Sequence, residues 1–296
     1  MDIKDLENIL IVYKKSVFEQ YTRKKADQKT NEYARNTPSL RESHDIQQRA
    51  MAAVILAVEK TGIPYHNVYR GDLTPELVDK ADLVISVGGD GTLLQVSHYL
   101  RNTPVFGVNS DPKRSVGYFS LATAETIGEY LANFESMKIT PLQRLQVAID
   151  GENLPSPALN EILVSHADPA ETARYRLFVD GELQQRKETT VIKSSGLLVC
   201  TAAGSTGWMY EAGGKIMPLG SKRMQFHVRE QRGSGFHFAR EEIVLESQTR
   251  EGKAYLDGRL KYDFTVGSTL KIRNGPPLRL VGNLREKQRM MKKRID

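Results

Sequence analysis

The stretch from Asp82 to Leu94, DLVISVGGDGTLL, is an apolar run that stops at a cluster of glycines and then resumes. A short β-branched run that ends in glycines is typical of a buried parallel strand whose carboxyl end faces a ligand. The residues after it, TLLQVSHYL, space their apolar positions three to four apart, which predicts a helix rather than the second strand of a hairpin. The stretch therefore predicts a strand, a glycine-rich loop and a helix in succession.

The loop comprises Gly88, Gly89, Asp90, Gly91 and Thr92. Its glycines can adopt positive φ and let backbone N–H groups approach an anion, and the following helix N-terminus adds further N–H groups and a positive dipole end. A phosphate group is the expected ligand of this loop. A carboxylate repels phosphate, so Asp90 is expected to act as a base for a hydroxyl or to anchor a cation that accompanies the phosphates. The loop predicts phosphoryl transfer to an alcohol, and the alternative from the pentapeptide alone is a structural turn.

Alternating strands and helices organise the first half of the chain. Strands are expected at 8–14, 83–87 and 104–109, and helices at 40–60 and 92–101, which predicts an α/β N-terminal domain with a parallel sheet. The polar segment 20–39 is expected to be a mobile loop or a helix end. After about residue 142 the pattern changes to short strands separated by turn residues, which predicts an all-β C-terminal domain. Three Asp-Gly pairs mark expected hairpin or strand-end turns, at 150–151, 180–181 and 257–258.

Length and composition exclude several classes of protein. The chain has 296 residues, enough for two domains, and its apolar stretches fall short of the roughly 20 residues that a membrane span needs. The opening segment does not resemble an Arg-rich presequence and a single cysteine suits a reducing compartment, so we expect a cytoplasmic protein without a membrane partner. We expect no nucleic-acid partner, because the segment 285–296 holds six basic and two acidic residues and so carries +4 of the net charge of +6. Six scattered histidines predict no metal site built by the protein, and the single cysteine, Cys200, is expected to be a small buried residue.

A second small-residue segment, KSSGLLVCTAAGSTGWMYEAGG, runs from Lys193 to Gly214. A strand leads into small and hydroxyl residues and then Trp208, which together can form a wall for a flat ligand such as a nucleotide; a glycine-rich connector is the alternative. Upstream, Asn160 and Glu161 form a polar pair inside an apolar segment. Their partners could be ribose hydroxyls and adenine nitrogens, or both groups could face water on an edge strand.

Three separated motifs occur in order: GGDGT at 88–92, NE at 160–161 and TAAGSTGW at 201–208. Together they resemble the NAD kinase family, which phosphorylates the 2′-hydroxyl of the adenosine ribose of NAD. The resemblance implies an α/β nucleotide-binding domain at 1–140 plus 277–296 and a β-rich dinucleotide-substrate domain at 141–276. It also implies ATP or polyphosphate as donor, Mg²⁺ or Mn²⁺ bound through the phosphates, NAD or NADH as acceptor, and a homodimer or homotetramer.

The resemblance also implies roles for individual residues. Asp90 would be the catalytic proton acceptor, and Asn160 and Glu161 would hold the adenosine half of the dinucleotide. The expected phosphate loop is Gly88, Gly89, Gly91 and Thr92. The expected substrate site is Gly91, Asn160, Glu161, Lys193, Ser195, Ala203, Thr206, Gly207 and Trp208.

Two positions depart from the common family pattern. Ser195 stands where many members have an aspartate, and TAAGSTGW stands where many members have TPTGSTAY. The serine and the tryptophan at these places resemble the mitochondrial-type branch of the family. Loss of a carboxylate opposite the nicotinamide end changes how a cationic oxidised ring is tolerated relative to neutral NADH. One alternative is a GGDGT-type lipid kinase. The other is a non-catalytic dinucleotide-binding regulator, which the substitutions at Ser195 and Ala202 relative to the family pattern would indicate.

Overall fold

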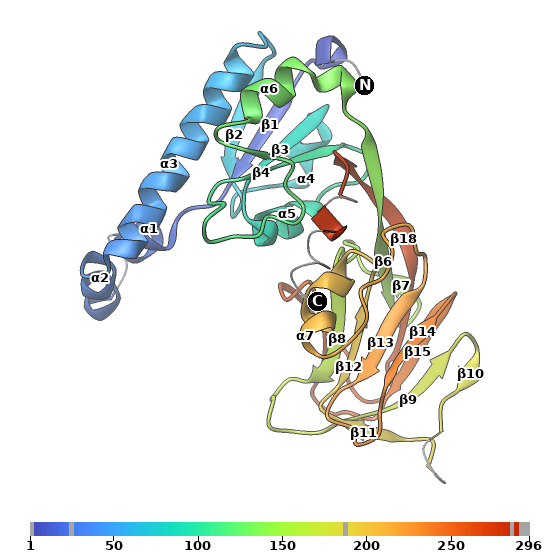
Figure 1. Cartoon of the computed structure of the whole chain (residues 1–296). Helices are drawn as coiled ribbons and strands as arrows, with labels where there is room; N and C mark the ends of the chain where they lie inside the picture. The colour runs from blue at the N-terminus through green and yellow to red at the C-terminus, as the bar shows by residue number, and fades with distance from the viewer. Residues whose placement is uncertain (1–2, 24–26, 186–188, 285–286, 290–296) are drawn as a thin grey trace. The chain divides into compact units, whose positions relative to one another are not determined.

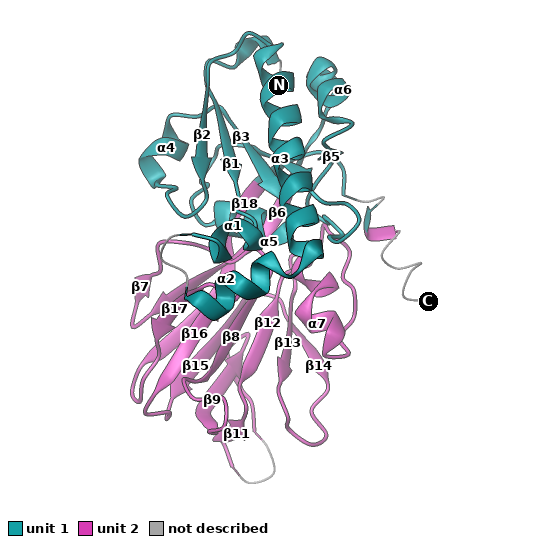
Figure 2. Cartoon of the chain, turned by 90° about the vertical axis from the view of Figure 1, so that its left-hand side faces the viewer, with its two compact units in different colours: residues 1–140, 279–287 teal, residues 141–278, 288–296 magenta. Residues whose placement is uncertain are grey.

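The computed structural model describes residues 3–23, 27–185, 189–284 and 287–289. These residues form two compact units, coloured separately in Figure 2. Unit 1 comprises 3–140, 279–284 and residue 287, and unit 2 comprises 141–278 with residues 288 and 289.

Unit 1 contains a parallel sheet in the order β2-β1-β3-β4, with β5 and the last residues of β18 pairing parallel to β4 (Figure 1). The strand β3 is buried along its whole length, as a central parallel strand must be. These features confirm the predicted α/β domain. Its strands are β1 (Ile9–Tyr13), β2 (Tyr65–Tyr69), β3 (Leu83–Gly88), β4 (Val105–Asn109) and β5 (Ala122–Thr123). Its helices are η1 (Ile3–Asp5), α1 (Val17–Tyr21), α2 (Gln28–Arg35), α3 (Pro38–Glu59), α4 (Pro75–Asp79), α5 (Asp90–Ser97), α6 (Ile127–Ala132) and η2 (Phe134–Ser136).

Two local expectations differ from the structure. The helix after the glycine loop begins at Asp90, with Gly89 as its N-cap, and not at Thr92. The polar segment 20–39 is mostly helical, apart from 24–26, which lie outside the described residues. Its helix α2 begins because the Asp27 side chain accepts a hydrogen bond of 3.0 Å from the N–H of Thr30, which satisfies a donor that the helix itself leaves unpaired.

Unit 2 is built on antiparallel strands, which confirms the predicted β domain. One sheet has the order β14-β13-β12-β8-β16-β17, and a second group runs β10-β9-β15-β18, with β11 beside β9 and β6 beside β18 and β7. The main core takes residues from both groups, including Ile162, Tyr175 and Leu245. The strands are β6 (Ile139–Ile149), β7 (Glu152–Asn153), β8 (Glu161–His166), β9 (Ala173–Val179), β10 (Glu182–Leu183), β11 (Ile192–Ser194), β12 (Leu197–Cys200), β13 (Met224–Val228), β14 (Phe236–Ala239), β15 (Glu242–Ser247), β16 (Gly252–Leu256), β17 (Leu260–Asp263) and β18 (Thr269–Val281). Two short helices, η3 (Gly204–Thr206) and α7 (Trp208–Glu211), follow β12.

The three Asp-Gly pairs form the tight hairpins that the sequence predicts. They connect β6 to β7, β9 to β10 and β16 to β17. The aspartate φ values are 52°, 50° and 49° at Asp150, Asp180 and Asp257, and the paired glycines also have positive φ. Asp and Gly tolerate this left-handed backbone, whose twist matches that of the flanking strands.

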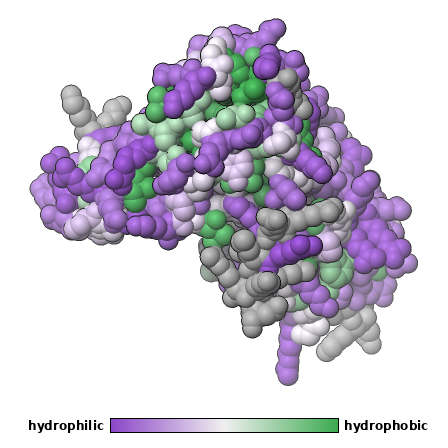
Figure 3. Space-filling model, turned by 45° about the horizontal axis from the view of Figure 1, so that its top comes forward, coloured by the Kyte–Doolittle hydropathy of each residue, from purple (hydrophilic) through white to green (hydrophobic). Residues whose placement is uncertain are grey.

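The face of the molecule shown in Figure 3 is mainly hydrophilic. In the face shown in Figure 3, hydrophobic side chains gather chiefly in the upper part of the view. Among the described residues, no helix has the length and apolar character that a membrane crossing requires.

Candidate functional site

The carboxylate of Asp90 is held by two main-chain amides. Its Oδ2 accepts a hydrogen bond from the N–H of Tyr118, and its Oδ1 accepts one from the N–H of Phe119, both at 2.9 Å. Each carboxylate oxygen has a second lone-pair site, so these bonds leave acceptor capacity for a hydroxyl. Asp90 therefore lies at the first turn of α5 in a fixed orientation and can still accept a proton.

The backbone of the glycine loop differs from the expectation in one respect. Gly88, Gly89 and Gly91 are not among the glycines with positive φ, so the expectation of left-handed backbone there is wrong. A Cβ on Gly88 would collide with the hydroxyl of Thr92, and a Cβ on Gly89 would lie 2.7 Å from Ser115 Oγ. Around Gly91 a Cβ would meet no described atom within 4 Å. Close packing against Thr92 thus requires glycine at 88. Gly89 lies against a serine hydroxyl that can rotate, and Gly91 leaves open space at the start of the helix.

Two basic residues lie beside this loop and were not identified from the sequence. Tyr13 pairs in register with Tyr69 on one side and with Val87 on the other. Lys14 and Arg70 are the next residues after their strands and therefore lie next to Gly88. Arg70 Nη1 lies 3.4 Å from the carbonyl oxygen of Gly91 and 3.4 Å from Thr92 Oγ1. Burial, followed by the charge of Arg70, lowers the pKa of Lys14. Two neighbouring cations at the carboxyl edge of a parallel sheet favour a polyanionic ligand.

Asn160 and Glu161 lie at the start of β8, which is an interior strand of its sheet. The alternative of a solvated edge strand is therefore wrong. Asn160 Oδ1 and Glu161 Oε2 are buried and have no hydrogen-bond partner among the described residues. Buried polar atoms normally have partners, so these two point to a ligand with hydroxyl or amino groups.

The backbone of this pair is organised by Asp257. Its carboxylate accepts hydrogen bonds from the N–H groups of Leu159 at 2.8 Å, Asn160 at 2.7 Å and Glu161 at 3.1 Å. Asp257 therefore forms the hairpin turn with its left-handed backbone and also fixes the main chain of the candidate site with its side chain. The sequence showed Asp257 only as part of a turn that could face a ligand.

Burial sets the protonation of these carboxyl groups. It raises the pKa of Glu161 to about 8, with a further contribution from the charge of Asp257. It raises the pKa of Asp257 to about 6, although the three main-chain donors and the charge of Arg144 act in the opposite direction. Glu161 is thus mainly protonated at neutral pH and can donate a hydrogen bond.

The segment 201–208 is joined to the Asn160 turn. The N–H of Thr201 donates to the carbonyl of Asn160 at 2.9 Å, and a Cβ on Gly204 would collide with that same carbonyl. A Cβ on Gly207 would lie 3.9 Å from Asn160 Nδ2. The side chain of Thr206 is partly exposed, and its Oγ1 donates to the carbonyl of Ala203. The fold therefore brings the second and third sequence motifs together within unit 2.

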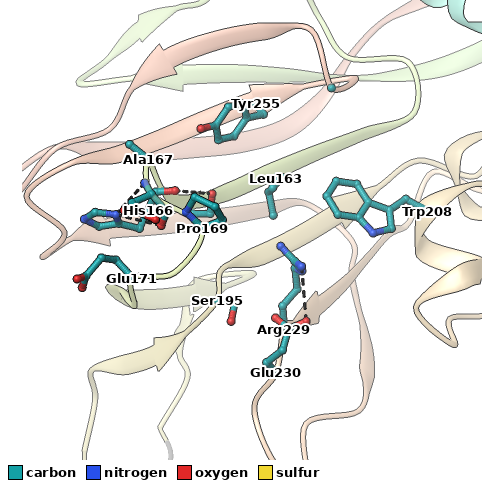
Figure 4. A pocket seen from close by; sticks show the side chains of 13 residues that line it. Leu163, His166, Ala167, Pro169, Glu171, Ser195, Trp208, Arg229, Glu230 and Tyr255 are labelled. Carbon is teal, nitrogen blue, oxygen red and sulfur yellow. Dashed lines mark hydrogen bonds and ion pairs between the residues drawn. The ribbon is translucent and has the colours of Figure 1, made fainter.

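A pocket of about 590 Å³ lies on the same sheet face as Glu161 and contains Ser195 and Trp208 (Figure 4). The guanidinium of Arg229 lies over the Trp208 ring, 5.2 Å from its centroid, and Arg229 also pairs with Glu230 at 3.5 Å. Lys193 is exposed on β11 and does not line this pocket. The remaining lining residues are Leu163, Ser165, His166, Ala167, Asp168, Pro169, Glu171, Tyr255 and Gly258.

Other chemistry is less favoured by the geometry. Cys200 is fully buried, and burial raises the pKa of its thiol to about 12, so it is a packed residue rather than a nucleophile. Among the described residues, no group of three or more His, Cys, Asp or Glu side chains is arranged to hold a metal ion.

Comparisons with known proteins agree with this architecture. A family model for the ATP-NAD kinase N-terminal domain matches residues 4–139. A probable NADH kinase of Oryza sativa subsp. japonica is 35% identical over 249 residues, which cover 75% of this chain and 76% of that protein. An NAD kinase from Archaeoglobus fulgidus, solved in complex with ATP, matches with a TM-score of 0.66 and 21% identity, over 97% of this chain and 98% of that one. The yeast NADH kinase complexed with NADH matches with a TM-score of 0.69 and 16% identity, over 98% and 87%. These two structures show that the fold is shared.

Proposed function

The chain belongs to the NAD kinase family, and from that premise we propose how its residues carry out the reaction. It is an NAD(H) kinase, which transfers the γ-phosphoryl group of ATP to the 2′-hydroxyl of the adenosine ribose and so forms NADP(H). Asp90 accepts the hydroxyl proton as the oxygen attacks the γ-phosphorus, and ADP leaves. The observation that carries this assignment is the Asp90 carboxylate, fixed by two main-chain amides within the glycine loop.

Unit 1 binds the phosphate donor in this proposal. The first turn of α5 presents its N-terminus to the phosphates, and Gly91 leaves room for them to approach the backbone. Lys14 and Arg70 supply positive charge beside the same loop, which stabilises the additional charge of a triphosphate or a polyphosphate chain.

Magnesium or manganese ions would reach the site with the donor phosphates. Asp111 is a residue of unit 1 that suits such an ion, because it lies two residues after β4 and its Oδ1 is buried with no hydrogen-bond partner among the described residues, while its Oδ2 pairs with Arg114 at 3.2 Å. Carboxylate oxygen is a preferred ligand of both cations. When bound, the ion would neutralise negative charge on the phosphoryl oxygens.

Unit 2 binds the dinucleotide in this proposal. Asn160 and Glu161 offer one acceptor and, through the protonated carboxyl group, one donor to the adenosine half. Gly207 lies beside Asn160, and we assign Ala203 and Thr206 of the same segment to the same binding surface. The adjoining pocket with Ser195 and Trp208 receives the nicotinamide half.

NADH is the preferred acceptor in this proposal. The nicotinamide pocket contains the cation of Arg229, and a serine stands at 195 where many family members have an aspartate. An oxidised nicotinamide ring is positively charged, whereas the reduced ring is neutral. A ring bound against Trp208 has the Arg229 guanidinium as its neighbouring charge, which disfavours the oxidised form, although Asp168, Glu171 and Glu230 also line the pocket and act in the opposite direction. The relative named as a probable NADH kinase supports this preference.

The test is NADP(H) formation by the purified protein with Mg²⁺ and ATP, in parallel with NAD and NADH, for wild type and Asp90→Asn. Removing the base should lower kcat by a factor on the order of 10² or more, with a smaller change in KM. Near-normal kcat in the variant would show that Asp90 is not the base. Dinucleotide binding without turnover in wild type would favour a regulatory protein instead.

Two further arms of the assay address the remaining alternatives. Replacing ATP by inorganic polyphosphate identifies the donor. Vesicles containing diacylglycerol test lipid kinase activity, which we do not expect because the unit 2 pocket places Arg229, Glu230 and Asp168 where an acyl chain would lie. Light scattering of the same preparation measures the assembly, which we propose to be a homodimer or homotetramer.

A further inference from the structure

A tight turn at residues 117–120 lies between Asp90 and the lysine at position 287. The N–H of Ser120 donates to the carbonyl of Gly117 at 3.0 Å, which closes the turn. The two central residues, Tyr118 and Phe119, direct their N–H groups to the Asp90 carboxylate. The orientation of Asp90 therefore depends on where this turn is held.

The ammonium group of Lys287 holds the two ends of the turn. Its Nζ donates to the carbonyl of Gly117 at 2.6 Å and also to the carbonyl of Ser120. A lysine has three donors, so one side chain can bind both carbonyls together. The turn thus has main-chain donors that face Asp90 and main-chain acceptors that face Lys287.

The other contacts of the turn show why its position is sensitive. Gly117 has a φ of 58°, and a Cβ there would collide with the side-chain amide of Asn109. That amide donates to the carbonyl of Ser115 at 2.9 Å. The turn therefore lies close against the end of β4, and Lys287 is the contact that comes from the far end of the chain.

We propose that Lys287 is a positioning residue for phosphoryl transfer, which acts by fixing the 117–120 turn and, through its amides, the carboxylate of Asp90. This inference rests on the proposed role of Asp90 as the base. It assigns a specific structural role to Lys287 of the basic C-terminal segment, instead of a general electrostatic attraction of anions by the whole segment.

Electrostatics support the same arrangement. Burial lowers the pKa of Lys287, and the negative charge of Asp90 acts in the opposite direction. A neighbouring carboxylate favours the charged form of a partly buried ammonium group. The ammonium is therefore retained beside the base by its two carbonyl acceptors and by Asp90.

The experiment compares Lys287→Met with Lys287→Arg, and with Arg289→Met as the matched control, because Arg289 is a described and exposed basic residue of the same segment. Loss of the ammonium should lower kcat about 10-fold or more while both KM values change less than about 2-fold, since misplacing a catalytic group affects mainly the chemical step. Arginine can also donate to two carbonyls, so Lys287→Arg should recover most of the lost kcat. Arg289→Met should match wild type.

Hydrogen exchange at the amides of Tyr118 and Phe119 is the second readout. Lys287→Met should accelerate exchange at these two amides and leave the amides of β3 unchanged. Unchanged kcat together with unchanged exchange at the turn would overturn the proposal, as would a loss seen only in KM. If Lys287→Met does not fold, Lys287→Gln against Lys287→Arg gives the same comparison.

The two proposals fail in different ways. If Asp90→Asn keeps near-normal kcat, the base assignment is wrong, whatever Lys287 does. If Asp90→Asn is inactive but Lys287→Met is normal in both readouts, only the positioning role is wrong.

Discussion

The guanidinium of Arg229 lies over the indole ring of Trp208, 5.2 Å from the ring centroid, in the pocket that Ser195 also lines. This pair places a fixed positive charge on an aromatic wall. Because the two redox forms of the dinucleotide differ by one positive charge, our proposal that the nicotinamide half binds here makes Arg229 a residue that can distinguish them.

Arg229→Gln should therefore shift the choice of substrate. The ratio of kcat/KM for NAD to kcat/KM for NADH should rise about 3- to 10-fold, the effect of removing one like charge at several ångströms in a partly solvated site. Steady-state assays with both dinucleotides measure the ratio. Arg250→Gln, which removes an exposed charge outside the pocket, should leave it unchanged. An unchanged ratio in Arg229→Gln would mean that the nicotinamide ring does not bind there.

Asp257→Ala should destabilise unit 2 and the dinucleotide site together. It removes the acceptor of three main-chain donors, at Leu159, Asn160 and Glu161, and should lower the free energy of unfolding by about 2–4 kcal/mol. Urea denaturation measures the change. Asp263→Ala is the control, because that carboxylate is 73% exposed and forms a surface pair with Lys253, so its removal should cost less than about 1 kcal/mol.

The stability of the ligand-free protein should depend on pH through Glu161. Burial raises its pKa from the ordinary value of 4.5 to about 8, so the folded state binds a proton that the unfolded state has released. The stabilising effect of protonation is complete below pH 4.5 and is lost as the pH rises through 8. Wild type should therefore lose stability between pH 5 and 9 relative to Glu161→Gln, as followed by thermal unfolding. Parallel curves for the two proteins would contradict the burial of an unpaired carboxyl group.

Gly88→Ala and Gly91→Ala should behave differently although both lie in the same loop. The Cβ at 88 collides with the Thr92 hydroxyl, so Gly88→Ala should unfold at lower temperature. At 91 the Cβ meets no described atom, and alanine favours a helix by up to about 1 kcal/mol over glycine, so stability should be kept or increased. Loss of ATP turnover in a stable Gly91→Ala protein would identify Gly91 as a ligand contact. Full activity would remove it from the donor site.

The sequence by itself determined the class of fold and the motifs. The run into Gly88 predicted a buried parallel strand, and the Asp-Gly pairs predicted hairpins, because both depend on local periodicity and on the backbone freedom of single residues. The motifs at 88–92, 160–161 and 201–208 were sufficient to indicate the family. The reason for glycine at 88 was not predicted correctly, because it is a close contact with Thr92 and not a positive φ.

Only the tertiary structure decided which distant residues support the site. Lys14 and Arg70 reach the glycine loop through the register of three parallel strands. Asp257 binds the backbone of Asn160 from 97 residues away, and Lys287 reaches the turn that holds Asp90 from 170 residues away. Each of these is a single polar residue, and no sequence motif around it indicates its contact. Its contacts depend on strand pairing and chain closure, which no short segment of sequence specifies.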